Sequence, residues 1–439
     1  MSHKPNLIVI GGGLAGCEAA WQASLLGIDV TLFEMRPVKT TPAHKSDYLA
    51  ELVCSNSLGA DRPETAAGIL KQELRALNSL IMQAADAHKI PAGGALAVDR
   101  EKFAAQISQT LANQPDVNII RREVTDISLD TPTIISSGPL TSDALAQQLQ
   151  PLVGDERLYF YDAISPIICA DSINYDKAFR ASRYGRGGDD YLNCPLTEEG
   201  YQNFYRELIN AAQHQAKDFE KQRFFEGCMP VEEIARRGEK TLLFGPMKPV
   251  GLTDPLTCRR PFAVVQLRME NQIGDMYNLV GFQTSLKWGE QKRIFGLIPG
   301  LEKAEYLRYG SLHRNTFINA PLVLTPTLQH KAHPLLFFAG QITGVEGYLE
   351  STAMGLMAGI YAARMLRGQS LDLMPETTAI GSLIKYITCA DPKHFQPMNI
   401  NLGIFPPLER RIRDKAERAA EIGRRAVRDL GGWKEGISF

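Results

Sequence analysis

Near the start of the chain, three glycines at a fixed spacing follow a short apolar run. Gly11, Gly13 and Gly16 come directly after Asn6–Ile10, which we expect to be a buried parallel strand. In such a turn the first glycine permits a tight bend, the second lets the backbone approach a pyrophosphate, and the third allows close packing of helix on strand. The phosphates then lie on the N-terminus of the following helix, where backbone N–H groups point at them. The spacing therefore predicts a dinucleotide site.

An acidic residue stands where the second strand of this unit is expected to end. A helix from about Leu14 to Leu26 and a strand from Asp29 to Glu34 complete a βαβ unit. Glu34 is placed to accept a hydrogen bond from a ribose hydroxyl, and an acid there disfavours the 2′-phosphate of NADP. Because the strand, the turn, the helix, the second strand and its terminal acid all agree with a dinucleotide site, an ordinary glycine-rich turn is the weaker interpretation. The expected cofactor contacts are Gly11, Gly12, Gly13, Leu14, Ala15, Gly16 and Glu34.

The glycine turn fits FAD and NAD equally well, and a second apolar strand late in the chain distinguishes between the two cofactors. The run from Pro334 ends in Ala339-Gly340-Gln341, and a helix of small residues is expected from about Glu350 to Leu366. This pattern is similar to the segment with which many two-part flavoproteins close over the ribityl chain and the isoalloxazine ring. A core strand with a packed helix is the structural alternative. We predict FAD, with Gly340 and Gln341 among its contacts.

The residue composition and the predicted secondary structure change in the middle of the chain. Between about residues 175 and 319, Gly, Pro, Arg and aromatic residues are frequent, and β-like runs appear at 262–268 and 277–284. Outside this region helical and strand patterns dominate, with helices expected at 62–88 and 99–112 and strands at 117–120 and 133–135.

These patterns predict an α/β protein. A Rossmann-type FAD-binding domain, residues 1–175 and 325–439, would carry an inserted α+β domain, residues 176–324. The length of 439 residues is sufficient for more than one such domain. The tail from Pro407 to Asp429 is predicted to be a charged helix dense in arginine.

The bulk properties exclude several classes of protein. The formal net charge of -1 creates no overall attraction to polyanions, so nucleic-acid binding would need a local patch. No apolar run approaches the ~20 residues that span a bilayer, and the N-terminal run is too short for a signal peptide. The seven cysteines are an odd number without a C-x-x-C pair, which favours free thiols in a cytoplasmic protein over disulfides or a metal site. The oligomeric state, monomer or homodimer, stays open.

Several further motifs point to one family. They are Leu52–Leu58, Asp190–Pro195, Gly227–Glu232 and Phe338–Tyr348, with supporting blocks at 247–254, 280–293, 313–320 and 399–409. Together they resemble the folate- and FAD-dependent tRNA (uracil-5-)-methyltransferases of the TrmFO type, small relatives of the GidA-type flavoproteins. The likeness runs nearly end to end. It departs at Gly59, Cys258 and Ser285, where a basic residue, a glycine and a histidine are usual.

The resemblance implies methylation of carbon 5 of the T-loop uridine in tRNA without S-adenosylmethionine. Methylenetetrahydrofolate would pass its methylene to N5 of reduced FAD, and the flavin would pass it to uracil and reduce it to a methyl group. NAD(P)H would then restore FADH2.

Two cysteines serve this chemistry in the family, and they correspond to Cys54 and Cys228. A thiolate suits addition to carbon 6 of uracil, because it is strongly nucleophilic and leaves again readily. We expect Cys228 to be this nucleophile and Cys54 to assist beside the flavin, with the reverse assignment open. The structural alternative for each is a buried thiol that packs as a small hydrophobe. We interpret Cys194 as such a structural cysteine.

Basic residues gather in three places where RNA could be held. The first cluster lies around Tyr184 and the second around Trp288, and a solvated surface is an equal alternative for both. Acids interleave the third, in the C-terminal helix, so a solvated face is favoured there. The RNA-binding candidates are Arg180, Arg183, Arg186, Lys287, Lys292 and Arg293.

Other functions remain as alternatives. The same chemistry on ribosomal RNA and the wobble-uridine modification of GidA-type relatives would use a similar cofactor site, although those relatives are longer. A small-molecule flavin oxidoreductase would explain the FAD signals but neither cysteine motif.

Overall fold

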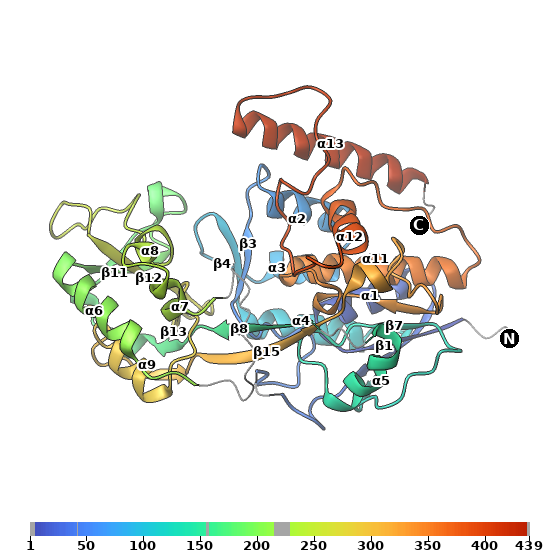
Figure 1. The fold of residues 1–439 in the computed structure, drawn as a ribbon, viewed down its shortest axis with the longest axis horizontal. Coiled ribbons are helices and arrows are strands. Elements are labelled where there is room, and N and C mark those ends of the chain that lie inside the picture. The colour runs from blue at the N-terminus through green and yellow to red at the C-terminus, as the bar shows by residue number, and fades with distance from the viewer. Residues whose placement is uncertain (1–4, 42, 155–157, 215–228, 437–439) are drawn as a thin grey trace.

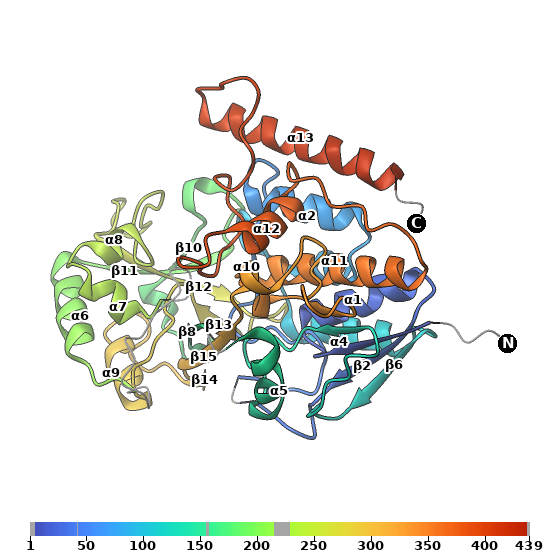
Figure 2. The same ribbon diagram turned by 45° about the vertical axis from the view of Figure 1, so that its right-hand side comes forward.

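A five-stranded parallel sheet forms the base of the first structural unit in the computed structural model, which describes residues 5–41, 43–154, 158–214 and 229–436 (Figures 1 and 2). The strand order is β16-β7-β1-β2-β6. Each neighbouring pair runs parallel, and β16 enters from late in the chain to pair with β7. The predicted Rossmann-type arrangement is therefore confirmed. The strands are β1 (Asn6–Ile10), β2 (Asp29–Glu34), β6 (Val117–Arg121), β7 (Thr133–Ile135) and β16 (Leu336–Phe338).

Two helices cross closely over this sheet, α1 (Leu14–Leu25) and α11 (Tyr348–Leu366). Glycines permit the approach: a Cβ added at Gly355 would lie 2.1 Å from the Ala15 carbonyl oxygen, and one at Gly359 would lie 2.5 Å from the Ala19 carbonyl oxygen. Almost every residue of α11 is buried, which explains why its sequence is apolar and small on all sides. The strand and helix predicted in this late segment are thus both present.

The prediction of one long helix over residues 62–88 is wrong in one respect, because the segment forms two helices, α2 (Ala66–Ala76) and α3 (Leu80–Ala87). Asn78 adopts a left-handed backbone (φ 56°), and the Ser79 hydroxyl accepts the N–H of Met82 to cap α3. An Asn-Ser pair is a helix stop followed by a helix start. The next helix, α4 (Arg100–Ala112), begins at the Asp99 cap as predicted.

The middle of the chain forms an antiparallel six-stranded sheet with its own core, and the order is β10-β11-β12-β13-β9-β14. The run expected at 277–284 is a strand only to Leu279. β9 lies before residue 176, and the domain boundaries given above stay a prediction. The strands are β9 (Ile167–Cys169), β10 (Phe179–Arg180), β11 (Tyr191–Leu196), β12 (Ala263–Met269), β13 (Met276–Leu279) and β14 (Tyr306–Arg308). The helices are α6 (Glu198–Asn210), α7 (Val231–Arg236), α8 (Thr241–Phe244) and α9 (Trp288–Phe295).

An antiparallel ribbon connects the two units, formed by β8 (Leu158–Ile164) and β15 (Ser311–Phe317). A small sheet of β3 (Ser57–Ala60), β5 (Ala95–Val98) and β4 (Lys89–Ile90) stands beside it. The remaining helices are α5 (Asp143–Val153), α10 (Ala320–Val323) and α12 (Ala379–Cys389).

The C-terminal helix, α13 (Lys415–Gly436), starts later than predicted and packs on α2 (Figure 1). The residues from Pro407 to Asp414 are not helical, because the helix begins only where the Asp414 carboxylate accepts the N–H of Glu417 (2.8 Å). One face of α13, including Ile422, Ala426 and Trp433, is buried. Among the described helices, none has the length and apolar character needed to cross a bilayer.

Candidate functional site

The glycine turn between β1 and α1 has the geometry of a phosphate cradle. A Cβ at Gly11 would lie 2.6 Å from the Ser136 carbonyl oxygen, and one at Gly16 would lie 1.8 Å from the Gly11 carbonyl oxygen, so both positions are closed by packing. Around Gly13, in contrast, nothing lies within 4 Å of an added Cβ. No side chain caps α1 in the described part of the chain, so its first N–H groups face open space. This cradle fits a pyrophosphate.

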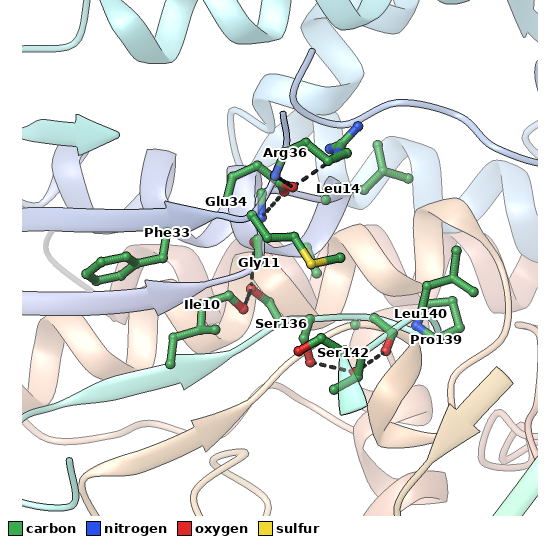
Figure 3. A pocket seen from close by; sticks show the side chains of 18 of the residues that line it. Ile10, Gly11, Leu14, Phe33, Glu34, Arg36, Ser136, Pro139, Leu140 and Ser142 are labelled. Carbon is green, nitrogen blue, oxygen red and sulfur yellow. Dashed lines mark hydrogen bonds and ion pairs between the residues drawn. The ribbon is translucent and has the colours of Figure 1, made fainter. Parts of the chain in front are cut away.

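Glu34 lies directly behind the turn at the end of β2 (Figure 3). Its Oε2 accepts the N–H of Gly12 (2.9 Å), and its Oε1 accepts both the backbone N–H and the Nε–H of Arg36 (3.0 and 2.9 Å). Burial opposes the charge of Glu34, but the hydrogen bonds and charge of Arg36 outweigh it and lower the pKa of the carboxyl. Glu34 therefore stays ionised and keeps acceptor capacity for a hydroxyl.

A cavity opens in front of the turn, with about 1040 Å³ of empty space that includes open solvent. It is lined by Gly11–Gly13, Glu34 and a loop that follows β7, whereas Gly16 does not line it. The loop contributes residues 136–142, and Ser136 fixes it by donating to the carbonyls of Ile10 and Gly11 (3.0 Å each). Gly340 and Gln341 line the same cavity. The structure thus brings the residues predicted from both ends of the chain together, with Ala15 2.7 Å from a Cβ at Gly340.

A second cavity adjoins the first, because both are lined by Val53, Pro139, Leu140, Gln341 and Tyr348, and its empty space of about 1400 Å³ includes open solvent. Cys54 lies on its wall and is partly exposed. Other walls come from the connecting ribbon and from the middle unit, through Ile164, Asn315 and Gln283. The glycine turn and the side chain of Cys54 therefore lie in adjoining cavities.

Three guanidinium groups and one phenol hold the cysteine loop, residues 52–57. Arg100 donates to the Leu52 and Cys54 carbonyls (2.6 and 3.1 Å), and Arg308 donates to the Val53 and Cys54 carbonyls (3.2 and 3.1 Å). Arg268 donates to Ser55 Oγ and to the Asn56 amide oxygen (2.7 and 2.9 Å). These contacts fix the backbone of the cysteine loop from several sides, and Arg100 is in turn paired with the buried Glu270.

The Tyr348 hydroxyl completes this loop by accepting the N–H groups of Cys54 and Ser55 (2.8 and 3.1 Å). Burial, together with the neighbouring Cys54, raises the pKa of Tyr348, so the phenol stays neutral. Burial and the charge of Arg100 lower the pKa of Arg308 to about 10, and Arg308 still carries its charge at neutral pH. The sequence motifs included Tyr348 without a role, and they gave no signal for Arg100 or Arg308.

A buried acid and a buried base lie behind the second cavity. Glu350 lines the cavity and accepts the N–H of Ile400 (3.0 Å), and burial raises its pKa to about 7. Lys71 donates to the Ala60 carbonyl (2.7 Å), and burial lowers its pKa to about 8 while the charges of Asp61 and Glu350 oppose that shift.

Cys228 lies outside the described residues, so its predicted role is not located. The chain after it is described: the N–H of Val231 donates to the Gln283 carbonyl (2.7 Å), and Gln283 lines the second cavity. The buried Glu232 accepts from Thr284 Oγ1 (2.9 Å) and from both the N–H and the hydroxyl of Ser285 (2.6 Å each). Ser285, a departure from the family pattern, thus has a structural partner.

In the two predicted RNA-binding clusters, some basic side chains are exposed and others are bound by neighbouring residues of the protein. Arg183 is half-buried and donates to Gln266 and to the Val250 carbonyl, whereas Arg186 is exposed over the ring of Tyr184 (5.5 Å). Arg180 reaches the Tyr277 hydroxyl (2.9 Å). In the second cluster Arg293 pairs with Glu207 and Glu290, and Lys287 and Lys292 are exposed.

Cys194 is fully buried in the middle unit, and burial raises its pKa to about 12. Its environment therefore suits a packed thiol rather than a nucleophile.

Comparisons with known proteins agree with this geometry. The family GIDA, described as Glucose inhibited division protein A, matches residues 6–370. Two crystal forms of Aquifex aeolicus GidA have the same fold, with TM-scores of 0.68 and 0.70 at 18% identity. The matches cover 97% and 98% of this chain and 74% and 76% of the GidA chain. They confirm the flavoprotein fold class.

Curated relatives are much closer in sequence. A protein from Pelotomaculum thermopropionicum named Methylenetetrahydrofolate--tRNA-(uracil-5-)-methyltransferase TrmFO is 59% identical over 430 residues, which cover 98% of each chain. Proteins of the same name from Heliobacterium modesticaldum and Geobacter sulfurreducens are 58% and 57% identical, and each match covers at least 97% of both chains. The chain therefore belongs to the TrmFO family of GidA-related flavoproteins.

Proposed function

We propose that this protein methylates carbon 5 of a uridine in tRNA, with FAD as cofactor and methylenetetrahydrofolate as the one-carbon donor. The adjacency of the two cavities carries the proposal. A dinucleotide on the glycine turn and a thiol on the wall of the second cavity would lie in adjoining cavities, lined in common by five residues. When bound there, FAD supplies one-carbon and hydride transfer.

The chain's own residues divide the binding work between the two cavities. The N–H groups at the start of α1 hold the pyrophosphate, and Glu34 accepts a ribose hydroxyl. Gly340, with its left-handed backbone (φ 82°), turns the chain so that Gln341 lines both cavities. The second cavity is the proposed site of the folate and of the uracil ring.

Cys54 and Cys228 are the proposed catalytic residues. Addition of a thiolate to carbon 6 of uracil makes carbon 5 nucleophilic, and departure of the thiolate after loss of the carbon 5 proton restores the ring. Cys228 is assigned the addition. Cys54 is assigned the role beside the flavin, because its loop is held by Arg100, Arg308 and Tyr348 on the cavity wall. NAD(P)H is the proposed source of reducing equivalents.

The RNA must reach the second cavity from the middle unit. Arg180, Arg183 and Arg186, with Lys287, Lys292 and Arg293, are the proposed contacts, and the most exposed of them are expected to contribute most. Phosphate contacts of this kind make binding strongly dependent on salt.

The test combines purified protein, unmodified tRNA transcript, methylenetetrahydrofolate and NADH or NADPH, followed by nucleoside analysis. We expect 5-methyluridine without S-adenosylmethionine. Cys228→Ala and Cys54→Ala should each abolish the product while FAD stays bound. Cys258→Ala is the matched control, because Cys258 is exposed and lines neither cavity, and it should keep full activity.

Other outcomes separate the alternatives. Formation of 5-methyluridine on ribosomal RNA but not on tRNA would identify ribosomal RNA as the substrate of the same chemistry. Oxidation of NAD(P)H without any modified nucleoside would favour a small-molecule oxidoreductase. Full methylation by Cys228→Ala would remove that residue from the mechanism.

A further inference from the structure

Three aromatic rings form a parallel stack on the surface of the middle unit. Trp288 stacks on Tyr309 with ring centroids 5.4 Å apart and planes inclined by 14°, and Tyr309 stacks on Tyr306 at 4.9 Å and 6°. Trp288 is 62% exposed. Because Tyr309 covers one face of the indole, this exposure leaves the other face open at the outer end of the stack.

The stack is held rigidly by the buried side chain of Gln291. Its Nε2 donates to the carbonyls of Leu286 and Gly310 (2.7 and 2.9 Å), and its Oε1 accepts the N–H of Gly310 (2.8 Å). These bonds tie the start of α9, which carries Trp288, to the turn that carries Tyr309. The Tyr306 hydroxyl donates to the Gln291 carbonyl (3.3 Å). The indole is therefore presented at low cost in conformational entropy.

Short segments of the chain connect the stack to the wall of the second cavity. Arg308, between Tyr306 and Tyr309 in sequence, donates to the carbonyls of Val53 and Cys54. Gln283, five residues before Trp288, lines the cavity. A group bound on Trp288 is thus connected through short, hydrogen-bonded segments to the wall on which Cys54 lies.

The charges around Trp288 are positive or neutralised. Lys287 and Lys292 are exposed and have no ion pair among the described residues. Arg293 is neutralised by Glu207 and Glu290. A flat aromatic face with two free ammonium groups suits a nucleotide, which offers a base to stack and a phosphate to neutralise.

We propose that Trp288 is the open face of a platform on which one unpaired nucleobase of the RNA substrate stacks, with Lys287 and Lys292 at the adjacent phosphates. The inference rests on the proposed function, since it takes RNA as the substrate. It adds a base-stacking subsite outside the catalytic cavity, supported from beneath by Tyr309 and Tyr306.

The test measures tRNA binding and methylation by Trp288→Ala, Trp288→Phe and the double variant Lys287→Ala/Lys292→Ala. Loss of base stacking on one aromatic ring is expected to raise the Kd for tRNA roughly 5- to 150-fold. Trp288→Phe, which keeps a ring, should stay within about threefold of the wild type. KM for tRNA should rise in Trp288→Ala while kcat stays near the wild-type value.

Salt dependence separates stacking from charge. Trp288→Ala should leave the slope of log Kd against log salt unchanged, whereas the double lysine variant should reduce it by roughly 0.7 for each phosphate that the protein no longer neutralises. Phe244→Ala is the matched control, since Phe244 is an aromatic residue that is 83% exposed on the same unit but lies at the end of α8, and its Kd should not change. Thermal unfolding of each variant establishes that it is folded.

An unchanged Kd for Trp288→Ala, in a preparation whose wild type binds and methylates tRNA, would overturn the platform alone. Equal losses in Trp288→Ala and Trp288→Phe would also overturn it, because stacking would then not be the interaction. If the wild type neither binds nor methylates tRNA, the proposed function fails and the platform fails with it.

Discussion

Gly355→Ala places a methyl group where the backbone of α1 now lies. The new Cβ would be 2.1 Å from the Ala15 carbonyl oxygen, and a tolerable contact requires about 3.2 Å, so the two helices must separate by roughly 1 Å. Overpacking of this kind costs about 1–3 kcal/mol, against which the better helix propensity of alanine gains up to about 1 kcal/mol. We expect a net loss of about 1–2 kcal/mol in the free energy of unfolding.

The same displacement should weaken FAD binding, because Ala15 lies in the first turn of α1. A shift of roughly 1 Å breaks a hydrogen bond of ordinary length, and a bond to a charged phosphate contributes about 1.5–3 kcal/mol. The Kd for FAD should therefore rise about 10- to 100-fold. Flavin fluorescence titration measures this Kd, and urea unfolding measures the stability.

Gly431→Ala is the matched control for helix propensity. Gly431 lies in α13 with nothing within 4 Å of an added Cβ, so this variant should gain up to about 1 kcal/mol and bind FAD normally. If Gly355→Ala is as stable as Gly431→Ala and keeps the wild-type Kd for FAD, the close crossing of α1 and α11 does not position the glycine turn.

Three other changes test separate parts of the structure. Cys258 has a left-handed backbone (φ 53°), which strains a residue with a side chain. Cys258→Gly should therefore raise the free energy of unfolding by about 0.5–1 kcal/mol, while Cys258→Ala leaves it unchanged. A loss of stability in Cys258→Gly would refute the backbone strain. Glu34→Gln removes the charge that Arg36 pairs with in a buried setting, and a loss of about 2–3 kcal/mol with weaker FAD binding is expected in urea unfolding and titration. The pKa of Lys71 is lowered to about 8 from 10.5, so between these values the unfolded chain holds a proton that the folded one has released, and stability rises with pH. In Lys71→Met this rise, at most about 1.4 kcal/mol per pH unit, should disappear; parallel pH profiles for the two proteins would contradict the shift.

The cofactor half of the fold follows from local patterns in the sequence. β1, β2 and the glycine turn are specified by residues within 30 positions of one another, so period, turn chemistry and the terminal acid all act locally. The same holds for β16 and α11. The predicted helix boundaries were wrong where a short polar motif outweighed a long helical periodicity. This happened at Asn78-Ser79 within the expected helix and at Asp414 before α13.

The surroundings of Cys54 could not be predicted in this way. Arg100 begins α4, whereas Arg268 and Arg308 belong to β12 and β14 of the middle unit. They meet at the contact between the two units, and no spacing in the sequence relates them to the cysteine loop. Sequence comparison identifies the thiol, but its electrostatic environment is a tertiary property.

This arrangement links the chemistry of Cys54 to the contact between the two units. Arg100 approaches the cysteine loop from the cofactor unit, while Arg308 approaches it from the middle unit, and both bind the carbonyl of Cys54 (3.1 Å each). A small rotation of the middle unit would act on both bonds, because Arg100 also pairs with Glu270, which follows β12 of the middle unit. Arg308 lies between Tyr306 and Tyr309 in sequence, so a ligand held on the aromatic stack would bind next to a segment that fixes the cysteine loop. The position of Cys54 is therefore expected to depend on what the middle unit binds.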